Sequence, residues 1–175
     1  MERENLAAVT VVGNDRPGIV AAVTRVLYEA GCNLLDASST ILHGHFSMML
    51  IVLAPDELAP EELESQLRPV EDEMHLRITV RSVAEAATEV TPATHMVSVY
   101  GADQPGIVFK VTQLLAESGV NINALSSRVI GSEDQPVYAL MLEVAAQGDV
   151  ASQVNALREQ LNMDVTVHPI DSALL

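Results

Sequence analysis

The sequence predicts an α+β protein made of two copies of one domain, each an antiparallel sheet with helices on one face. Two observations predict this fold class. Gly13–Val20, read as Gly-Asn-Asp-Arg-Pro-Gly-Ile-Val, returns 88 positions later at Gly101–Val108 as Gly-Ala-Asp-Gln-Pro-Gly-Ile-Val. Apolar and turn-forming residues then follow the order strand, helix, strand, strand, helix, strand in both halves of the chain.

The repeat extends well beyond this turn. At the same offset Val23-Thr24 matches Val111-Thr112, Asn33 matches Asn121, and Ser38-Ser39 matches Ser126-Ser127. Duplication of one domain is the economical explanation. We expect domains at residues 1–84 and 95–175, joined by a linker at 85–94 that is rich in Ala, Glu and Thr.

Each copy begins with a short β-rich run, at 7–12 and at 96–100, that ends in the Gly-x-Asp-x-Pro-Gly turn. A helix is predicted next, because apolar residues recur at helical spacing. In the first copy they are Ile19, Val23, Val26, Leu27 and Ala30, and in the second Ile107, Val111, Leu114 and Leu115. We expect Pro17 and Pro105 in the first helical turn and Gly31 and Gly119 to end the helices.

A hairpin is predicted after each helix, with strands at 33–42 and 46–53 and at 121–130 and 137–144. The second copy has about four more residues between its strands, which we place in the turn. A second helix then presents Leu63, Leu67, Val70 and Met74, or Val150, Val154, Leu157 and Leu161. Final strands at 76–83 and 163–170 complete a βαββαβ order twice, which is the ferredoxin-like arrangement.

Composition excludes several classes of protein. The formal net charge of −15 leaves no basic surface for direct contact with nucleic acid. The apolar runs are shorter than the roughly 20 residues that span a bilayer, and Met1–Asn5 lacks an apolar signal segment. We therefore expect a cytoplasmic protein that contacts neither membrane nor nucleic acid.

Nothing in the sequence predicts an active site, a metal centre or a cofactor. Cys32 is the single cysteine, and we interpret it as a small apolar residue. His43 and His45 flank Gly44 in a tight turn, where they could bind a metal as a pair or simply be solvated. Ser38-Ser39 and Ser126-Ser127 have no base placed to activate them, so packing or interface roles are expected.

The residues Asp-Arg-Pro-Gly-Ile-Val and Gly-Cys-Asn-Leu of the first copy resemble the ACT domain, and Asp-Gln-Pro-Gly-Ile-Val and Gly-Val-Asn-Ile of the second do likewise. Two such domains without a catalytic domain look most like the group of glycine cleavage system transcriptional repressors. The resemblance implies an amino acid bound where two ACT domains meet. The implied contacts are Asp15, Arg16, Pro17, Gly18, Ile19, Asn33 and Leu34, and Asp103, Gln104, Pro105, Gly106, Ile107, Asn121 and Ile122.

Physical chemistry supports such a site. The first N–H groups of a helix and its positive dipole end suit a carboxylate, and Gly18 or Gly106 lets a ligand approach the backbone. Asp15 or Asp103 could accept the ammonium group, while Asn33 and Asn121 can both donate and accept. Ile19 and Ile107 would supply apolar walls.

Structural alternatives exist for these residues. Asp15 and Asp103 could only cap their helices, and Asn33 and Asn121 could only hold turns. Arg16 occupies in the first copy the position that Gln104 occupies in the second, and it could hold a carboxylate or be a solvated surface residue. Some ACT domains carry a histidine and then an asparagine where this chain has glycine and then aspartate, which puts the identity of the ligand in doubt.

The sequence thus predicts a non-enzymatic sensor of an amino acid such as glycine or serine. It would act through a protein partner, in transcriptional regulation of the glycine cleavage system, and form a homodimer. The alternative is an interaction module without a ligand that dimerises through its sheets.

Overall fold

The computed structural model describes residues 5–83, 91–132, 135–146, 152, 154, 158 and 162–170. The chain divides into two compact units, Met1–Glu89 and Val90–Leu175. Each unit is treated by itself below as the first and the second domain. Residues 91–94 of the predicted linker lie beside the second sheet, where the Thr94 N–H donates to the carbonyl of Val144 at 2.8 Å. Linker residues 85–90 lie outside the described residues, and the linker bounds stay a prediction.

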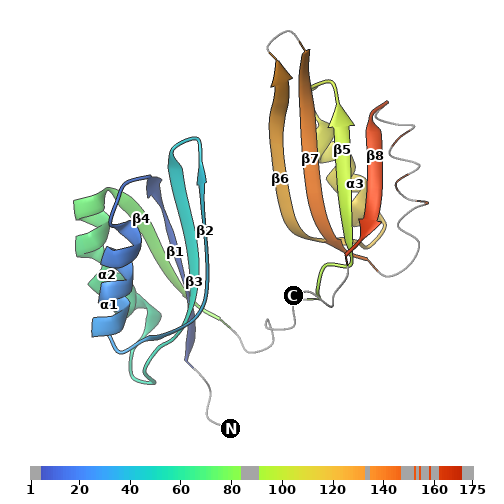
Figure 1. Ribbon diagram of the computed structural model, residues 1–175. Helices are drawn as coiled ribbons and strands as arrows, with labels where there is room; N and C mark the ends of the chain where they lie inside the picture. The colour runs from blue at the N-terminus through green and yellow to red at the C-terminus, as the bar shows by residue number, and fades with distance from the viewer. Residues whose placement is uncertain are drawn as a thin grey trace. The chain divides into compact units, whose positions relative to one another are not determined.

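The first domain has the predicted βαββαβ order. Its sheet runs β2-β3-β1-β4, and every neighbouring pair is antiparallel. Figure 1 shows both helices on the same face of this sheet. The elements are β1 (Leu6–Asn14), α1 (Ile19–Glu29), β2 (Asn33–Leu42), β3 (His45–Leu53), α2 (Pro60–Met74) and β4 (Leu76–Ser82).

The second domain repeats this topology, with strand order β6-β7-β5-β8. Of the second helix predicted here, Ser152, Val154 and Arg158 are described and helical, and Val154 is buried. Val150, Leu157 and Leu161, predicted on the same helix, lie outside the described residues. The named elements are β5 (His95–Gly101), α3 (Ile107–Glu117), β6 (Asn121–Ser132), β7 (Gln135–Ala145) and β8 (Asp164–Pro169).

The predicted apolar stripes form the cores. All four residues predicted on the inner face of α2 are buried, and on α1 the buried residues are Ile19, Val23 and Leu27. Val26 and Ala30, also predicted inward, are only partly buried at the flank of the same core. The α+β class with helices on one face of each antiparallel sheet is therefore confirmed.

The start of the helices differs from the prediction. Gly18 occupies the N-cap of α1 with φ of 95°, so Pro17 precedes the helix and does not lie in its first turn. Gly106 caps α3 in the same way with φ of 90°, and Pro105 precedes it. A left-handed backbone angle excludes most side chains, so the glycine rather than the proline defines where each helix begins.

The end of the helices agrees with the prediction. Gly31, with φ of 76°, follows the C-cap of α1. Its N–H donates to the carbonyl of Tyr28, and the Cys32 N–H donates to that of Leu27. These two bonds make a Schellman motif, which satisfies the last free carbonyls of the helix. The equivalent bonds follow Gly119 in the second domain.

The two hairpins differ in a way that the sequence prediction missed. In the first, His43 and Gly44 both have positive φ, at 50° and 78°, which is the two-residue turn that best matches strand twist. In the second, the extra residues lengthen the strands and not the turn, because Gly131 pairs with Pro136 and Ser132 pairs with Gln135. The β6–β7 hairpin therefore extends beyond the last residue of β5.

Candidate functional site

The turn between the first strand and the first helix of each domain carries most of the predicted ligand contacts. Asp15, Arg16, Pro17 and Gly18 are all exposed, as are the four equivalent residues of the second domain. The turn is tied to the neighbouring hairpin, because the Asp15 N–H donates to the Gly44 carbonyl at 2.8 Å. An exposed turn held at both ends can present its side chains and the helix N-terminus to a small ligand.

The aspartates of the turns do not cap their helices. Both N-cap residues are glycines, and neither helix start has a side-chain hydrogen bond at its cap. Helix capping was the structural alternative for Asp15 and Asp103, and the structure contradicts it. Each carboxylate lies on the exposed turn, where it remains free to accept a hydrogen bond from a ligand.

Ile19 and Ile107 were expected to form apolar walls of the site. They are only 2% and 3% exposed and belong to the two cores. They therefore hold the first turn of each helix against the sheet from beneath. A ligand on the turn would meet backbone N–H groups and polar side chains before it met these two.

Asn33 does not meet the turn of its own domain. Asn33 pairs with Leu53, and Leu53 pairs with Leu6, at the opposite end of the sheet from the pair of Asn14 with His45. The eleven residues of α1, a span of about 16 Å, separate the two groups. Asn121 is likewise placed at the far end of α3, so the structure brings turn and asparagine together in neither domain.

The edge strands β2 and β6 begin at these asparagines. In each domain the start of the edge strand lines a groove beside the first helix. In the second domain Asn121 and Ile122 line a groove of about 510 Å³ together with Phe109, Thr112 and Gln113 of α3. In the first domain Leu34 lines a smaller groove of about 130 Å³ with Val20 and Thr24 of α1. We call these two surfaces the helix–edge grooves. Their helix residues were missed, although the apolar Val20 and Phe109, outside the inward stripe, were a signal.

The groove of the first domain exists because its sheet extends past its helices. Leu34, Ala37 and Ser39 lie opposite Val52, Leu50 and Met48, which are buried beneath the helices, so they share the helix-side face. All ten residues of β2 are nevertheless exposed. Leu34 and Ile41 remain 46% and 57% exposed on that face. An edge strand with an uncovered apolar face is a surface that other chains can pair with.

At the opposite edge of each sheet, a side chain of the second helix bonds to the backbone of the last strand. The Val80 N–H of β4 donates to the Glu64 carboxylate of α2 at 2.9 Å. In the second domain Arg158 Nε donates to the Val165 carbonyl of β8 at 2.6 Å. Within residues 5–83, no side chain from another element makes such a bond to the backbone of β2. The β2 edge is therefore the one left open for strand pairing.

Cys32 is a free cysteine of intermediate burial. Burial raises the pKa of the partly buried Cys32 thiol, which makes its reactive thiolate less available. Among the described residues, no group of three His, Cys, Asp or Glu side chains is placed to hold a metal ion. None of the helices described is long and apolar enough to cross a membrane.

Comparison with known proteins gives a match in each half. Residues 5–81 match one family model of the ACT domain, and residues 95–162 match another. The chain is 25% identical to the glycine cleavage system transcriptional repressor of Escherichia coli K12, over 98% of this chain and 93% of that protein. A UPF0237 protein of Methanopyrus kandleri is 37% identical over 43% of this chain and 84% of its own length.

A solved structure shares the fold of nearly the whole chain. It is an unknown protein from Galdieria sulphuraria, with a TM-score of 0.79 and 22% identity over 95% of this chain and 99% of that one. At this level of identity the likeness concerns the fold alone. The matches therefore account for both halves, and the full-length similarity is to a regulatory protein.

Proposed function

Because the chain belongs to the ACT-domain family, we propose that it senses a small amino acid, such as glycine or serine, and passes this signal to a protein partner. A regulatory, non-enzymatic role is supported by the two ACT domains and by the regulatory relative. The observation that carries the finer proposal is the similarity to the E. coli repressor along almost the entire length of both chains. We therefore place the protein in the cytoplasm, in transcriptional control of the glycine cleavage system.

The exposed turns are the proposed binding elements. A ligand carboxylate would accept hydrogen bonds from the first N–H groups of α1 or α3, which have no partner within their helix. Its ammonium group would donate to Asp15 or Asp103, and Arg16 adds a second carboxylate contact in the first domain. Gly18 and Gly106 keep side chains away from this backbone.

In this proposal, a ligand bound at one turn can contact only the asparagine of another ACT domain. Asn33 and Asn121 lie at the far end of the helix from the turn of their own domain. A ligand that contacts both a turn and an asparagine must therefore be held where two ACT domains meet. Binding of this kind favours one assembly over another, because the ligand stabilises the state in which both domains contribute.

The partner is proposed to be a protein and not nucleic acid. A net charge of −15 opposes direct contact with phosphates. A change in the population of a homodimer, or in its surface, would be the signal that a DNA-binding partner receives. This keeps a role in transcription compatible with an acidic chain.

The second candidate is an interaction module that has no ligand. The open β2 edge and the apolar side chains beside it favour this function, because they suit pairing of sheets whether or not an amino acid is present. The two candidates differ in what stabilises the fold. A sensor gains stability from its ligand, whereas a module gains stability only from protein concentration.

Thermal unfolding with millimolar amino acids, beginning with glycine and serine, tests the proposal. A ligand at 100 times its Kd should stabilise the folded chain by about 2.7 kcal/mol. We expect one or two amino acids to raise Tm, and Asp15→Ala or Asp103→Ala to remove the increase for the domain that binds. Asp56→Ala is the matched control, since Asp56 is exposed in the same domain away from the turn. An unchanged Tm with every amino acid would favour the interaction module.

A further inference from the structure

The two domains carry the same ion-pair positions with the charges reversed. Near the end of the second helix and the start of the last strand, corresponding residues lie 87 positions apart, as Leu76 and Met163 do. Glu71 and Arg77 of the first domain therefore correspond to Arg158 and Asp164 of the second. The reversal preserves a possible pair, so the two arrangements can be compared directly.

In the first domain this pair is closed. Arg77 Nη1 lies 3.2 Å from Glu71 Oε1, and the Glu71 side chain is only 17% exposed. The pair joins the last turn of α2 to the start of β4, beside the end of β1. The two charges therefore pair with each other, while the Arg77 side chain stays 79% exposed.

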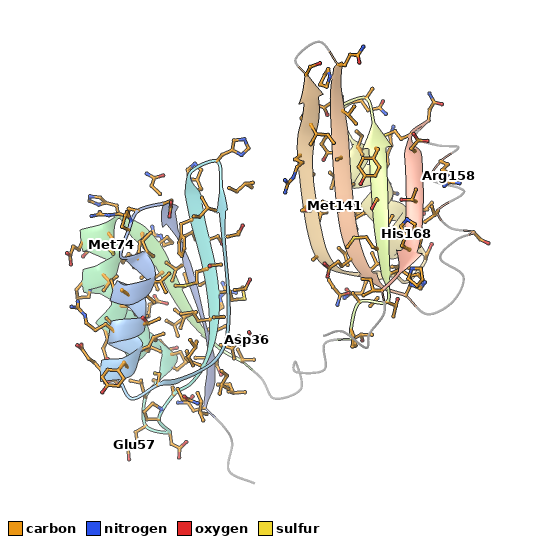
Figure 2. All side chains as sticks on the ribbon, viewed as in Figure 1. Asp36, Glu57, Met74, Met141, Arg158 and His168 are labelled. Carbon is orange, nitrogen blue, oxygen red and sulfur yellow. The ribbon has the colours of Figure 1, made fainter. Side chains whose placement is uncertain are left out.

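In the second domain the equivalent pair is open. Arg158 Nε donates to the Val165 carbonyl at the edge of β8, and Figure 2 shows Arg158 beside this strand. Within the part of the chain that the structure describes, no ion pair joins Arg158 to Asp164. A pocket of about 240 Å³ lies at this position, lined by Tyr100, Gly101, Arg158, Asn162, Met163 and Asp164.

The chemistry of this pocket suits a small zwitterion. The Nη groups of Arg158 can hold a carboxylate from two directions while Nε stays on the strand. Asp164 lies directly opposite Tyr100 across the β5–β8 pair, so a carboxylate and a phenol flank one wall. Asn162 adds an amide that can donate and accept, and the buried Met163 forms an apolar floor. Its volume of about 240 Å³ accommodates a small ligand.

We propose that this pocket binds a small α-amino acid, with its carboxylate on Arg158 and its ammonium group on Asp164. The pocket adjoins the turn at Gly101 but uses none of the residues Asp103–Ile107 that carry the proposed function. In the first domain the corresponding arginine and carboxylate, Arg77 and Glu71, form an ion pair with each other. The second domain would accordingly respond to an amino acid even where its turn does not.

A titration of the full chain with glycine, followed by amide chemical shifts, tests this site. We expect saturating shifts at Gly101, Asn162 and Asp164. Asp164→Asn leaves the Arg158 contact with β8 in place and should weaken binding at least tenfold. Glu71→Gln, which breaks the closed pair of the first domain, is the matched control and should leave these shifts unchanged. Asp103→Ala should leave the shifts at Asn162 and Asp164 unchanged, even if it abolishes binding at the turn.

Two further probes separate a zwitterion site from a simple ion site. Acetate and methylamine each supply one half of glycine, and each should bind at least tenfold more weakly than glycine. The double variant Arg158→Glu with Asp164→Arg reproduces the first-domain pair and should close the pocket, so that glycine no longer shifts Asn162. Equal binding of acetate and glycine, undiminished binding by the double variant, or no shift at these amides would overturn the proposal.

Discussion

A glycine near the end of the first strand of each domain lies where a neighbouring strand approaches closely. A Cβ on Gly13 would lie 2.6 Å from Leu76 Cδ2, 3.2 Å from the His75 carbonyl oxygen and 3.3 Å from Leu76 Cα. At Gly101 the added atom would meet only the side chain of Met163, with contacts from 2.9 Å. The first position is restricted by the Leu76 side chain and also by backbone, whereas the second is restricted only by a side chain that can change its rotamer.

We therefore expect Gly13→Ala to destabilise the first domain by about 1 to 3 kcal/mol, the usual cost of overpacking. Gly101→Ala should cost the second domain less, since Met163 can move aside. Urea denaturation of both variants measures the difference. A Gly101→Ala variant that loses as much stability as Gly13→Ala would contradict the explanation from backbone contact.

Residue roles in the turn could be predicted from the sequence only in part. The pattern Asp-x-Pro-Gly located the turn, because glycine and proline act on the backbone whatever surrounds them. It did not tell whether Ile19 faces a ligand or the core, since the first inward position of a helix serves either purpose. Nor did it separate a capping aspartate from a free one, because that depends on which residue becomes the N-cap.

At the scale of elements, the two edges of each sheet are treated differently. Glu64 and Arg158 occupy backbone groups of β4 and β8, whereas β2 is exposed along its whole length. The homodimer that we propose would use the open β2 edge, because a helix side chain already occupies one backbone group on each of the opposite edges.

A lysine at Ile41 tests the open edge. Ile41 is 57% exposed, so Ile41→Lys should cost less than about 1 kcal/mol of folding stability. We expect it to weaken self-association at least tenfold, because a charge would have to be buried in the pairing surface. Tyr28→Lys is the control, since Tyr28 is 82% exposed on α1. Sedimentation equilibrium measures the effect, and equal dissociation constants for the two variants would rule out pairing through β2.

The second hairpin shows which information the prediction of secondary structure from the sequence did not have. The extra residues of the second copy were correctly located in the sequence between β6 and β7. Whether they lengthen the turn or the strands depends on cross-strand pairing, such as Gly131 with Pro136, and no local pattern reports that. By contrast, the core stripe of α2 was predicted completely, because a period of 3.6 residues is a local property.

At the scale of the whole molecule, the duplication of one domain made the topology predictable from the sequence. Agreement between the two copies made the βαββαβ order predictable from the amino-acid pattern alone. The separation of Asn33 from Asp15 could also have been predicted from the sequence, since Asn33 follows the helix that Asp15 precedes. The pocket of the second domain could not be predicted from the sequence. The reversed charges at Arg158 and Asp164 become informative only by comparison with the Glu71–Arg77 ion pair of the first domain.

The most direct test of the central claim is isothermal titration calorimetry of the full chain with glycine and then with serine. The proposed function predicts saturable heat for at least one of them, with affinity lowered at least tenfold by Asp15→Ala or Asp103→Ala and unchanged by Asp56→Ala. Absence of binding by every common amino acid, or binding that neither turn variant weakens, would contradict amino-acid sensing at the turns.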